Sequence, residues 1–521
     1  MGPSGAGVSG GTIRRISEIR MSVFDRRSSG VLCHPTSLHH LGRGNAHSFG
    51  GDLGPSSRSF VDWLSRAGQS WWQMLPIVPP GNEMSPYDSA SAFAGSPALL
   101  SIDDLRRSRL LTPRDLTAAG PRGQLRQRLL RQAYSRFLQR GDGARALGRF
   151  RRRHAAWLPD FALFTALKAE LRGVVWWEWP RALRERDPDA MRAARRRLAP
   201  EIDYQCFLQL CFDEQLSALK GYAEERGVRL MGDVPMYVAR DSAEVWQHPE
   251  LFKLDARGRP RLVAGVPADA FNPEGQLWGN PVYDWRRHRA TGFDWWLSRL
   301  GRCLDYFHAV RLDHFIGLSR CWEVPLAATS ALTGRFRRVP GRELLSAAEA
   351  HFEVPSGGLP FVAEDLGLLT PEVERLRDDF GLLGMRVLQF GFGDDKQHLP
   401  HLYPERSVAV TGTHDTNTLL GWCADLETTR TPAAALERRK FTLYLGEAKP
   451  TSAHHTLLRA CLGSVSRLSI LPLQDILGLG VRARMNVPGT SEGNWGWRLT
   501  RGALKDSDAA WLAETCAAYD R

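Results

Sequence analysis

The sequence predicts an α/β fold, a (β/α)8 TIM barrel, on three observations. Eight short runs rich in apolar, β-branched and aromatic residues recur along the 521-residue chain. Helical patterns separate most of these runs, as in βα repeats. Several runs end in charged side chains, which is typical of barrel strands that deliver functional groups to one face. A doubly wound open sheet is the alternative, but no run is followed by a G-x-G-x-x-G turn.

Each expected strand is a short apolar run bounded by glycine, proline or polar residues. The first four are "GVLCHP" (30–35), "WWQMLPI" (71–77), "VRLMGDVPMYV" (228–238) and "HAVRLDHF" (308–315). The last four are "PFVAEDL" (360–366), "GMRVLQFGF" (384–392), "SVAVTGTHD" (407–415) and "RLSILPLQD" (467–475). Between them, segments such as "DWLSRAG" (62–68) and "TPEVERLRDDFG" (370–381) carry apolar residues at helical spacing.

Three intervals between strands are longer than a βα unit needs. We therefore expect subdomains inserted on the C-terminal face of the barrel at about 80–227, 239–300 and 317–358. Residues 1–29, Gly/Ser-rich at their start, are predicted to be a mobile N-terminal segment, and residues 30–521 a single catalytic barrel. The chain runs only about 45 residues beyond the eighth strand, so no C-terminal β-sandwich is expected.

The formal net charge of +12 is concentrated in two arginine-rich stretches, 122–153 and 181–197. In the first, apolar residues recur at helical spacing, which favours an amphipathic surface helix with a solvated basic face. The alternative is an anion-binding or nucleic-acid-binding patch, but no nucleic-acid-binding motif accompanies it. We therefore expect no nucleic-acid partner.

The eight cysteines form no C-x-x-C pair and do not group with histidines at zinc spacing. They are expected to be reduced, buried thiols in a cytoplasmic protein. No apolar run approaches the ~20 residues that span a bilayer, and the N-terminus lacks the apolar core of a signal peptide, so no membrane association is expected. The sequence makes no prediction about the oligomeric state.

Charged and polar side chains gather where four of the expected strands end. They are Asp233 in the third strand, Arg311, Asp313 and His314 in the fourth, Glu364 and Asp365 in the fifth, and His414 and Asp415 in the seventh. Because strand ends converge on one barrel face, these carboxylates are expected to meet in one pocket. There a carboxylate can serve as nucleophile, acid or charge stabiliser. The alternative is a set of structural ion pairs.

Aromatic side chains provide the second indication of function. The chain has 17 tryptophans, and several lie in segments expected to be loops: Trp278, Trp422, Trp495 and Trp497, with Tyr87 in "SPYDSASAFAG". Aromatic faces beside polar groups suit sugar rings, which are apolar on their faces and hydroxylated at their edges. Packing in the core is the alternative for each one taken alone.

Taken together, the motifs resemble those of the 4-α-glucanotransferases, also called amylomaltases or disproportionating enzymes, of glycoside hydrolase family 77. The matching stretches in the first half include "GVLCHPTSL", "GDLGP", "MSPYDSASAFAGSP" and "GDVPMYVARDSAEVWQHPELF". Those in the second half include "VAGVPADAFNPEGQLWGNPVYDW", "VRLDHFIGL", "AEDLG", "GMRVLQF", "TGTHDTNT" and "ARMNVPGTSEGNWGWRL". They occur in family order and cover nearly the whole chain from about residue 30. Such proteins are similar to α-amylases in having a barrel and three catalytic carboxylates.

The resemblance implies roles for individual residues. Asp313 is expected to be the nucleophile, Glu364 the general acid/base and Asp415 the transition-state stabiliser. Arg311 would lie against Asp313 and keep it ionised. The expected substrate-binding residues are Arg311, His414, Asp233, Ser85, Tyr87, Gln276, Trp278 and Asn486. The stretch 265–278 resembles a mobile loop over the acceptor groove.

The implied reaction transfers a segment of a 1,4-α-D-glucan to the 4-hydroxyl of an acceptor, through a covalent glucosyl-enzyme and with retention. The expected ligands are maltooligosaccharides, glucose and other α-1,4-glucans. No cofactor or metal is expected, because carboxylates can perform this chemistry. The alternatives are a hydrolytic α-amylase-like glycosidase and a non-catalytic glucan-binding protein. The chain departs from the family pattern at Asn417, Leu402, Val481 and Arg482, which bears on acceptor preference rather than on the reaction.

Overall fold

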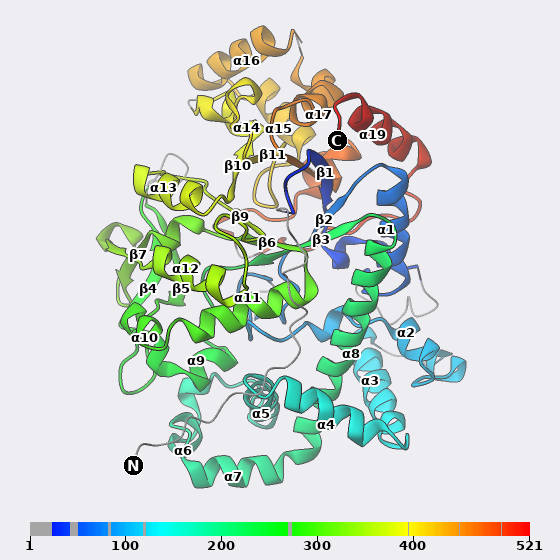
Figure 1. Cartoon of the computed structure of the whole chain (residues 1–521), viewed down its shortest axis with the longest axis vertical. Coiled ribbons are helices and arrows are strands. Elements are labelled where there is room, and N and C mark those ends of the chain that lie inside the picture. Colours follow the sequence, from blue (N-terminus) through cyan, green and yellow to red (C-terminus); the bar gives the residue numbers. More distant parts are fainter. Residues whose placement is uncertain are drawn as a thin grey trace.

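The computed structural model describes residues 23–41, 50–81, 85–117, 121–268, 274–393, 395–446, 449–490 and 492–521. Eight parallel strands form a closed barrel in the order β1-β12-β11-β10-β9-β6-β3-β2, with helices around it (Figure 1). The strands are β1 (Ser28–Leu32), β2 (Trp71–Gln73), β3 (Arg229–Val234), β6 (Ala309–Leu312), β9 (Phe361–Ala363), β10 (Leu383–Val387), β11 (Ser407–Val410) and β12 (Leu468–Pro472). Each lies within or overlaps one of the eight expected runs, so the predicted barrel is confirmed.

Most strands end earlier than the sequence predicts. β3 stops at Val234 rather than at residue 238, and the chain beyond Val387 forms the single-turn helix α14 (Leu388–Gly391) instead of continuing β10. That turn places Gln389 where its amide donates to the carbonyl of Asn417, 3.0 Å away. The apolar pattern continues past each strand because the segments that line the barrel mouth are also partly buried.

The barrel interior is filled by alternate residues of the strands. Buried side chains from seven strands form one cluster: Trp71, Met231, Ala309, Val362, Leu383, Met385, Val387, Val408, Val410, Leu468 and Ile470. Because neighbouring residues of a strand point to opposite faces, the intervening apolar residues pack outward against the helices. Phe24, just before β1, stacks on Trp71 with ring centroids 5.5 Å apart and joins this cluster.

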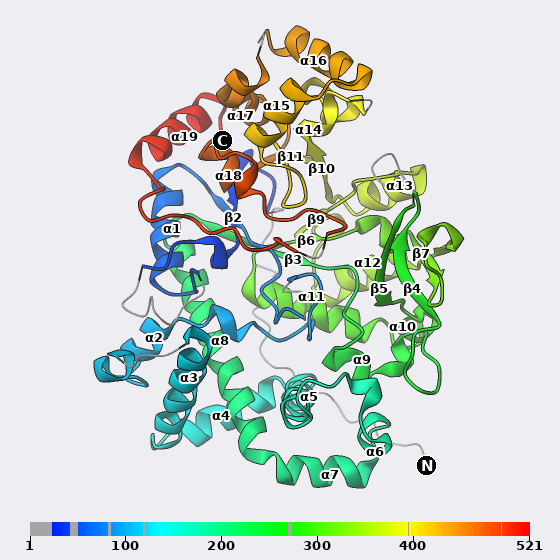
Figure 2. The same cartoon turned by 180° about the vertical axis from the view of Figure 1, so that it is seen from behind.

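The helices fall into three groups along the chain. Up to β3 these are α1 (Pro55–Arg66), α2 (Ile102–Arg107), α3 (Arg122–Leu138), α4 (Gly143–Arg153), α5 (Leu158–Glu170), α6 (Arg181–Arg184), α7 (Pro188–Arg197) and α8 (Ala199–Glu224). Between β3 and β9 they are α9 (Ala243–Gln247), α10 (Trp285–Ala290), α11 (Asp294–Tyr306) and α12 (Gly341–His351). The remainder are α13 (Pro371–Asp379), α15 (Leu419–Thr428), α16 (Pro432–Leu445), α17 (His454–Leu462), α18 (Leu473–Ile476) and α19 (Asp506–Ala518). Figure 2 shows α2 to α7 gathered at one end of the molecule.

The long intervals between strands do carry extra elements, but the last helix of an interval can belong to the barrel. α8 packs on β3 and α1, and α11 packs on β3 and β6. The expected bounds of the insertions, about 80–227, 239–300 and 317–358, stay a prediction. Residues 1–22 of the predicted N-terminal segment lie outside the described residues, and β1 begins at Ser28, inside the expected segment 1–29.

The basic stretch 122–153 is two helices, not the single helix predicted. α3 ends at Leu138 and α4 begins at Gly143. A side chain at Gly143 would meet the carbonyl oxygen of Phe137 at 2.2 Å, so glycine permits a tight reversal between the two helices. The apolar residues that indicated a helix lie between 125 and 138, all within α3, so their spacing carried no information about the break.

A second, four-stranded antiparallel sheet lies beside the barrel and was not predicted. Its order is β5-β4-β7-β8, with β4 (Leu262–Val266), β5 (Gln276–Pro281), β7 (Arg320–Pro325) and β8 (Arg335–Arg338). The expected loop 265–278 therefore has both of its ends in strands, and its residues 269–273 lie outside the described residues. Trp278 lies in β5 and Trp422 in α15, rather than in loops.

The side chain of Arg521 lies at the N-terminal end of the barrel, where β1 and β12 begin. It donates hydrogen bonds to the carbonyls of Ser28 (2.9 Å), Leu462 (2.5 Å), Ser464 (2.9 Å) and Ser466 (2.8 Å). Beyond β12, residues 473–490 and 492–521 contain helices and turns but no strand. Among the described residues, no helix has the length and apolar character needed to cross a membrane.

Candidate active site

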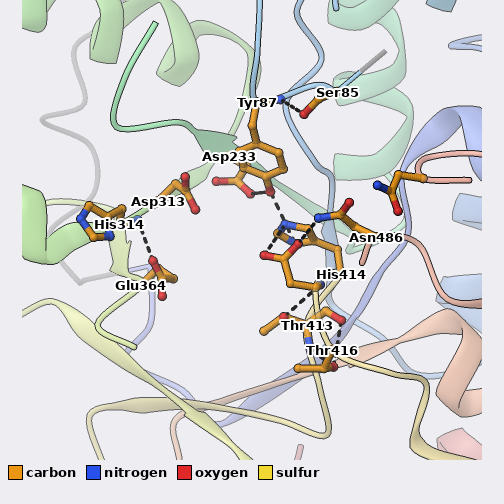
Figure 3. A network of polar contacts seen from close by, with 12 residues as sticks. Ser85, Tyr87, Asp233, Asp313, His314, Glu364, Thr413, His414, Thr416 and Asn486 are labelled. Atoms are coloured by element: carbon orange, nitrogen blue, oxygen red, sulfur yellow. Dashed lines mark hydrogen bonds and ion pairs between the residues drawn. The ribbon is translucent and has the colours of Figure 1, made fainter. Parts of the chain in front are cut away.

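The predicted side chains meet at the C-terminal mouth of the barrel (Figure 3). Asp233 is in β3 and Arg311 in β6, so these two project from the strands themselves. Asp313 and Glu364 each follow directly after a strand, β6 and β9 respectively. Backbone hydrogen bonds still hold both residues at the strand ends: Asp313 N–H donates to the Val234 carbonyl and Glu364 N–H to the Leu312 carbonyl, each at 3.0 Å. These positions can therefore present a carboxylate with little conformational freedom.

Arg311 links two of the carboxylates. Its Nη1 lies 2.8 Å from both oxygens of Asp233 and 3.0 Å from Oδ1 of Asp313. Arg311 and Asp233 are buried, whereas the Asp313 side chain is 25% exposed. Burial raises the pKa of Asp233 although Arg311 opposes this effect, and the two carboxylates hold the pKa of Arg311 well above its ordinary value. One buried cation therefore pairs with two acids, of which only Asp313 is exposed to solvent.

Both oxygens of Glu364 accept backbone hydrogen bonds. Oε2 accepts from the N–H of His314 at 2.7 Å, and Oε1 accepts from that of Leu366 at 3.2 Å. Burial is the main cause that raises the pKa of Glu364 to about 8, and the nearby Asp313 charge adds to it, while Arg311 and the His314 N–H act in the opposite direction. Glu364 is consequently protonated at neutral pH.

Asp415 has the opposite protonation state. His414 Nε2 lies 3.2 Å from its Oδ2, and the Asn486 amide donates to its Oδ1 at 2.6 Å. Burial alone would raise its pKa, but His414, Asn486 and Arg311 outweigh burial and lower it to about 2. The main chain of Asp415 is fixed as well, because Arg484 donates to its carbonyl at 2.6 Å.

An aromatic wall connects these groups. Tyr87 donates to Asp233 Oδ2 at 2.7 Å, and its ring stacks on His414 with centroids 4.9 Å apart and planes 12° from parallel. Trp495 lies 5.8 Å from both rings. The Oγ of Ser85 accepts from the N–H of Tyr87 at 3.2 Å and shapes the turn that carries the tyrosine (Figure 3).

Gln276 and Trp278 lie on β5, at the edge of the second sheet. The indole N–H of Trp278 donates to Oε1 of Gln276 at 3.2 Å. The indole ring meets the His314 ring edge-on, with centroids 4.9 Å apart and planes at 86°. Trp278 remains 36% exposed, so much of its surface can meet a ligand.

Three features of the site were missed or misplaced by sequence reasoning. Asp365 does not join the site: it is buried outside the barrel mouth, 2.6 Å from Arg377 Nη1, and accepts from the N–H of Met385 at 2.7 Å. Arg484 and the backbone N–H of His314 hold catalytic candidates but were not singled out for that. Arg484 stands in the quoted stretch "ARMN", which was the available signal.

The four departures from the family pattern lie around the mouth, not among the three carboxylates. Asn417 donates to Asp425 at 2.8 Å, and its Oδ1 is buried with no hydrogen-bond partner among the described residues. Leu402 is 50% exposed and Val481 57% exposed, and Arg482 is exposed beside Val481. The side chains of Leu402, Val481 and Arg482 are therefore open to solvent, whereas that of Asn417 is held by Asp425.

The arrangement supports acid/base chemistry on a glycosidic bond. Glu364, whose pKa is raised, can act as an acid and the neighbouring Asp313 as a nucleophile, which is the logic of retaining glycosidases. Asp415 adds a permanent negative charge that can stabilise an oxocarbenium-like transition state.

Comparison with known proteins agrees with this chemistry. The family model described as 4-alpha-glucanotransferase matches residues 33–504. The 4-alpha-glucanotransferase of Thermus thermophilus is 42% identical over 95% of this chain and 99% of its own, and that of Synechocystis is 41% identical over 94% and 96%.

Solved structures show the same likeness. The amylomaltase of Streptococcus agalactiae in complex with acarbose superposes with a TM-score of 0.88 at 34% identity, covering 95% of this chain and 100% of that one. The amylomaltase of Corynebacterium glutamicum, at 19% identity and a TM-score of 0.72, covers 96% of this chain and 76% of its own and shares the fold. The barrel, the carboxylates at its mouth and these full-length matches lead to one conclusion: the chain belongs to the 4-α-glucanotransferase family.

Proposed function

We propose that this 4-α-glucanotransferase acts by double displacement, with Asp313 as nucleophile, Glu364 as general acid/base and Asp415 as stabiliser of the transition state. The observation that carries the proposal is the separation of protonation states around Arg311. The pKa of Glu364 is raised to about 8, that of Asp415 is lowered to about 2, and Asp313 lies 3.0 Å from Arg311 with its side chain 25% exposed. Each carboxyl is thereby prepared for a different task.

In the first half-reaction, the proton of Glu364 passes to the glycosidic oxygen as the bond to the anomeric carbon breaks. An oxygen of Asp313 forms an ester with that carbon, and the chain bearing the new hydroxyl leaves. In the second half-reaction, Glu364 takes the proton of an acceptor 4-hydroxyl, whose oxygen displaces Asp313 and restores the α-linkage.

Transfer requires that a bound sugar intercept the ester before water does. Positioned nucleophiles reach effective molarities of roughly 10⁵ M or more, far above that of bulk water. We assign this positioning to Asp233, His414, Ser85, Tyr87, Gln276, Trp278 and Asn486, together with Arg311. The support for this assignment is their hydrogen-bond chain from Tyr87 to Asp233 and from Asn486 to Asp415, and the exposed face of Trp278.

The proposed substrates are maltooligosaccharides and other α-1,4-glucans as donors, with glucose or a glucan as acceptor, in glycogen or maltodextrin metabolism. The proposed compartment is the cytoplasm, which fits the eight free thiols of the chain. Incubation of the pure protein with maltotriose should release glucose together with oligomers longer than maltotriose. Glucose and maltose alone would indicate hydrolysis, and an unchanged substrate would indicate a binding protein.

The assigned roles are tested by trapping the ester in Glu364→Gln. α-Glucosyl fluoride needs little acid assistance to leave, so the variant should still form the ester but should lack the base that resolves it. Intact-protein mass spectrometry is expected to show one added hexosyl unit, and peptide mapping to place it on the fragment with Asp313. Azide, which needs no deprotonation, should release α-glucosyl azide.

The control is the double variant Glu364→Gln, Asp313→Ala, which should take no label. A label on Asp415, or a β-azide product, would show that the roles are assigned to the wrong residues.

A further inference from the structure

His314 has an unusual backbone for a residue with a side chain. Its φ of 47° and ψ of 52° lie in the left-handed region, which favours glycine and tolerates asparagine better than most residues. It follows Asp313 directly and precedes the short helix η8 (Phe315–Leu318). The strain falls at the point where β6 passes the general acid/base proposed above.

The left-handed residue shifts the hydrogen-bond ladder between β6 and β9 by one position. In the parallel ladder Val310 N–H donates to Pro360 O at 2.9 Å, and Glu364 N–H donates to Leu312 O at 3.0 Å. Continued at the same two-residue step, the ladder would have His314 N–H donate to the carbonyl of Glu364. Instead Phe315 N–H takes that carbonyl at 3.0 Å, which leaves the His314 N–H free of the ladder.

The freed N–H donates to the side chain of Glu364 instead. It meets Oε2 at 2.7 Å (Figure 3). The Leu366 N–H donates to Oε1 at 3.2 Å, so the carboxyl is fixed at both oxygens. A general acid must lie within hydrogen-bond reach of the atom it protonates, and rotation of the carboxyl would break that geometry.

The imidazole of His314 is packed so that it secures this conformation. Trp278 meets the ring edge-on at 4.9 Å, and a side chain at Gly317 would come within 3.1 Å of His314 Cδ2. Burial lowers the pKa of His314 to about 4, so the ring is neutral at ordinary pH and adds no charge beside Asp313.

We infer that His314 is a positioning residue for Glu364, and that its left-handed backbone is the means: it withdraws one N–H from the strand ladder and directs it to the acid/base. The backbone of His314 positions Glu364, and the packing of the imidazole stabilises that backbone conformation. The inference rests on the role proposed for Glu364.

The test compares His314→Asn with His314→Val. Both remove the imidazole, but asparagine adopts the left-handed region readily whereas a β-branched residue does not. Thermal unfolding and circular dichroism establish that each variant is folded. His314→Asn should keep kcat/KM for maltotriose within roughly tenfold of the parent enzyme, whereas His314→Val should lose roughly 100-fold, the lower range for a displaced general acid.

Two further readouts separate positioning from general damage. With α-glucosyl fluoride, single-turnover fluoride release by His314→Val should fall less than tenfold, since that leaving group needs little acid.

Arg311, Asp313 and Asp365 are the charged groups that face Glu364 and are unchanged in both variants. Loss of an N–H that stabilises the carboxylate should move the alkaline limb of the His314→Val pH profile to higher pH.

The outcomes distinguish the inference from the proposed function. Equal losses in the Asn and Val variants would overturn the inference and assign the role to the imidazole. If His314→Val does not fold, retention of activity by His314→Asn still decides between backbone and ring. If the activity of Glu364→Gln does not depend on the leaving group, the role proposed for Glu364 is wrong, and the inference about His314 is wrong with it. If the activity of Glu364→Gln depends on the leaving group but that of His314→Val does not, only the positioning role of His314 is wrong.

Discussion

At the scale of single residues, the proposed reaction uses three carboxyls, Asp313, Glu364 and Asp415, each in a different role. Arg311 is buried and contacts one of them, Asp313, as well as a fourth carboxyl, Asp233, so its charge is shared between Asp233, which never meets solvent, and Asp313, which does. Removing either acid leaves the cation partly unpaired in a buried position, which is costly. Asp233 can thus be essential without touching the reacting atoms.

The protonation of Glu364 predicts the alkaline limb of the pH profile. Its pKa of about 8 means that the acid is present below pH 8 and is lost as the pH rises through that value. kcat/KM for maltotriose is therefore expected to fall tenfold per pH unit above about pH 8. Fluoride release from α-glucosyl fluoride should persist over the same range, because it does not need the acid. A parallel fall with both donors would contradict this assignment.

Replacement of Asp313 tests the nucleophile directly. Asp313→Asn keeps the size of the side chain and its neighbour Arg311, so maltooligosaccharide binding measured by calorimetry should survive. Transfer measured with maltotriose should fall by roughly 10⁴-fold or more, since the ester can no longer form. Activity above a few per cent of the parent enzyme would show that another residue attacks.

At the scale of elements, three of the arginines of α3 are engaged within the molecule. On α3, Arg131 pairs with Glu201, Arg136 with Asp115, and Arg126 is buried and donates to three backbone carbonyls, including that of Leu100 at 2.5 Å. Side chains engaged in this way do not form a continuous phosphate-binding surface.

We therefore expect no nucleic-acid binding of even micromolar strength by these helices. Fluorescence polarisation with labelled duplex DNA and single-stranded RNA, at 50 and 200 mM salt, is the measurement. A strong signal that weakens steeply with salt would be the signature of counterion release and would restore the alternative reading of stretch 122–153.

The barrel strands were predictable because each is a buried parallel strand with a compact apolar signal. The strands of the second sheet were not. β8 reads "RFRR" and is exposed along its whole length, and β5 reads "QLWGNP", with polar and flexible residues. They are held by pairing between two separate insertions, β4 with β7, which no local pattern reveals.

The residues of the site also differ in whether a local sequence pattern or only tertiary contact brings them together. Asp313 and Glu364 stand immediately after strands, so their convergence followed from the barrel alone. Asp415 lies beyond the end of β11, and Asn486 lies in a long loop after β12; their meeting at 2.6 Å depends on tertiary contacts. Asp415 was expected in the pocket because it ends the seventh predicted run, whereas only the family resemblance indicated Asn486.

At the scale of the whole molecule, the barrel is stabilised where its first and last strands meet. β1 pairs with β12 from Ser28 with Leu468 to Leu32 with Pro472, and the guanidinium of Arg521 bridges the floor beneath them. This end lies opposite the active site. Stability and activity should therefore respond separately to changes there.

Arg521→Ala is expected to lower the free energy of unfolding by about 2 kcal/mol, because it removes charge-assisted hydrogen bonds to buried carbonyls. The measurement is the urea midpoint, with transfer activity at 25 °C expected to remain unchanged. Arg521→Lys is the matched control: it keeps the charge but cannot reach four carbonyls at once, and should fall between the two. No change in either variant would mean that water replaces these bonds at no cost.

The pairing of β1 with β12 also sets the order of events during biosynthesis. Ser28 leaves the ribosome about 440 residues before its partner Leu468, a delay of roughly 20 to 90 s at ordinary elongation rates. Throughout that time one edge of β1 has no strand to pair with, and an unpaired edge is a template for aggregation. A nascent chain stalled before residue 468 should consequently engage chaperones that the completed chain no longer needs.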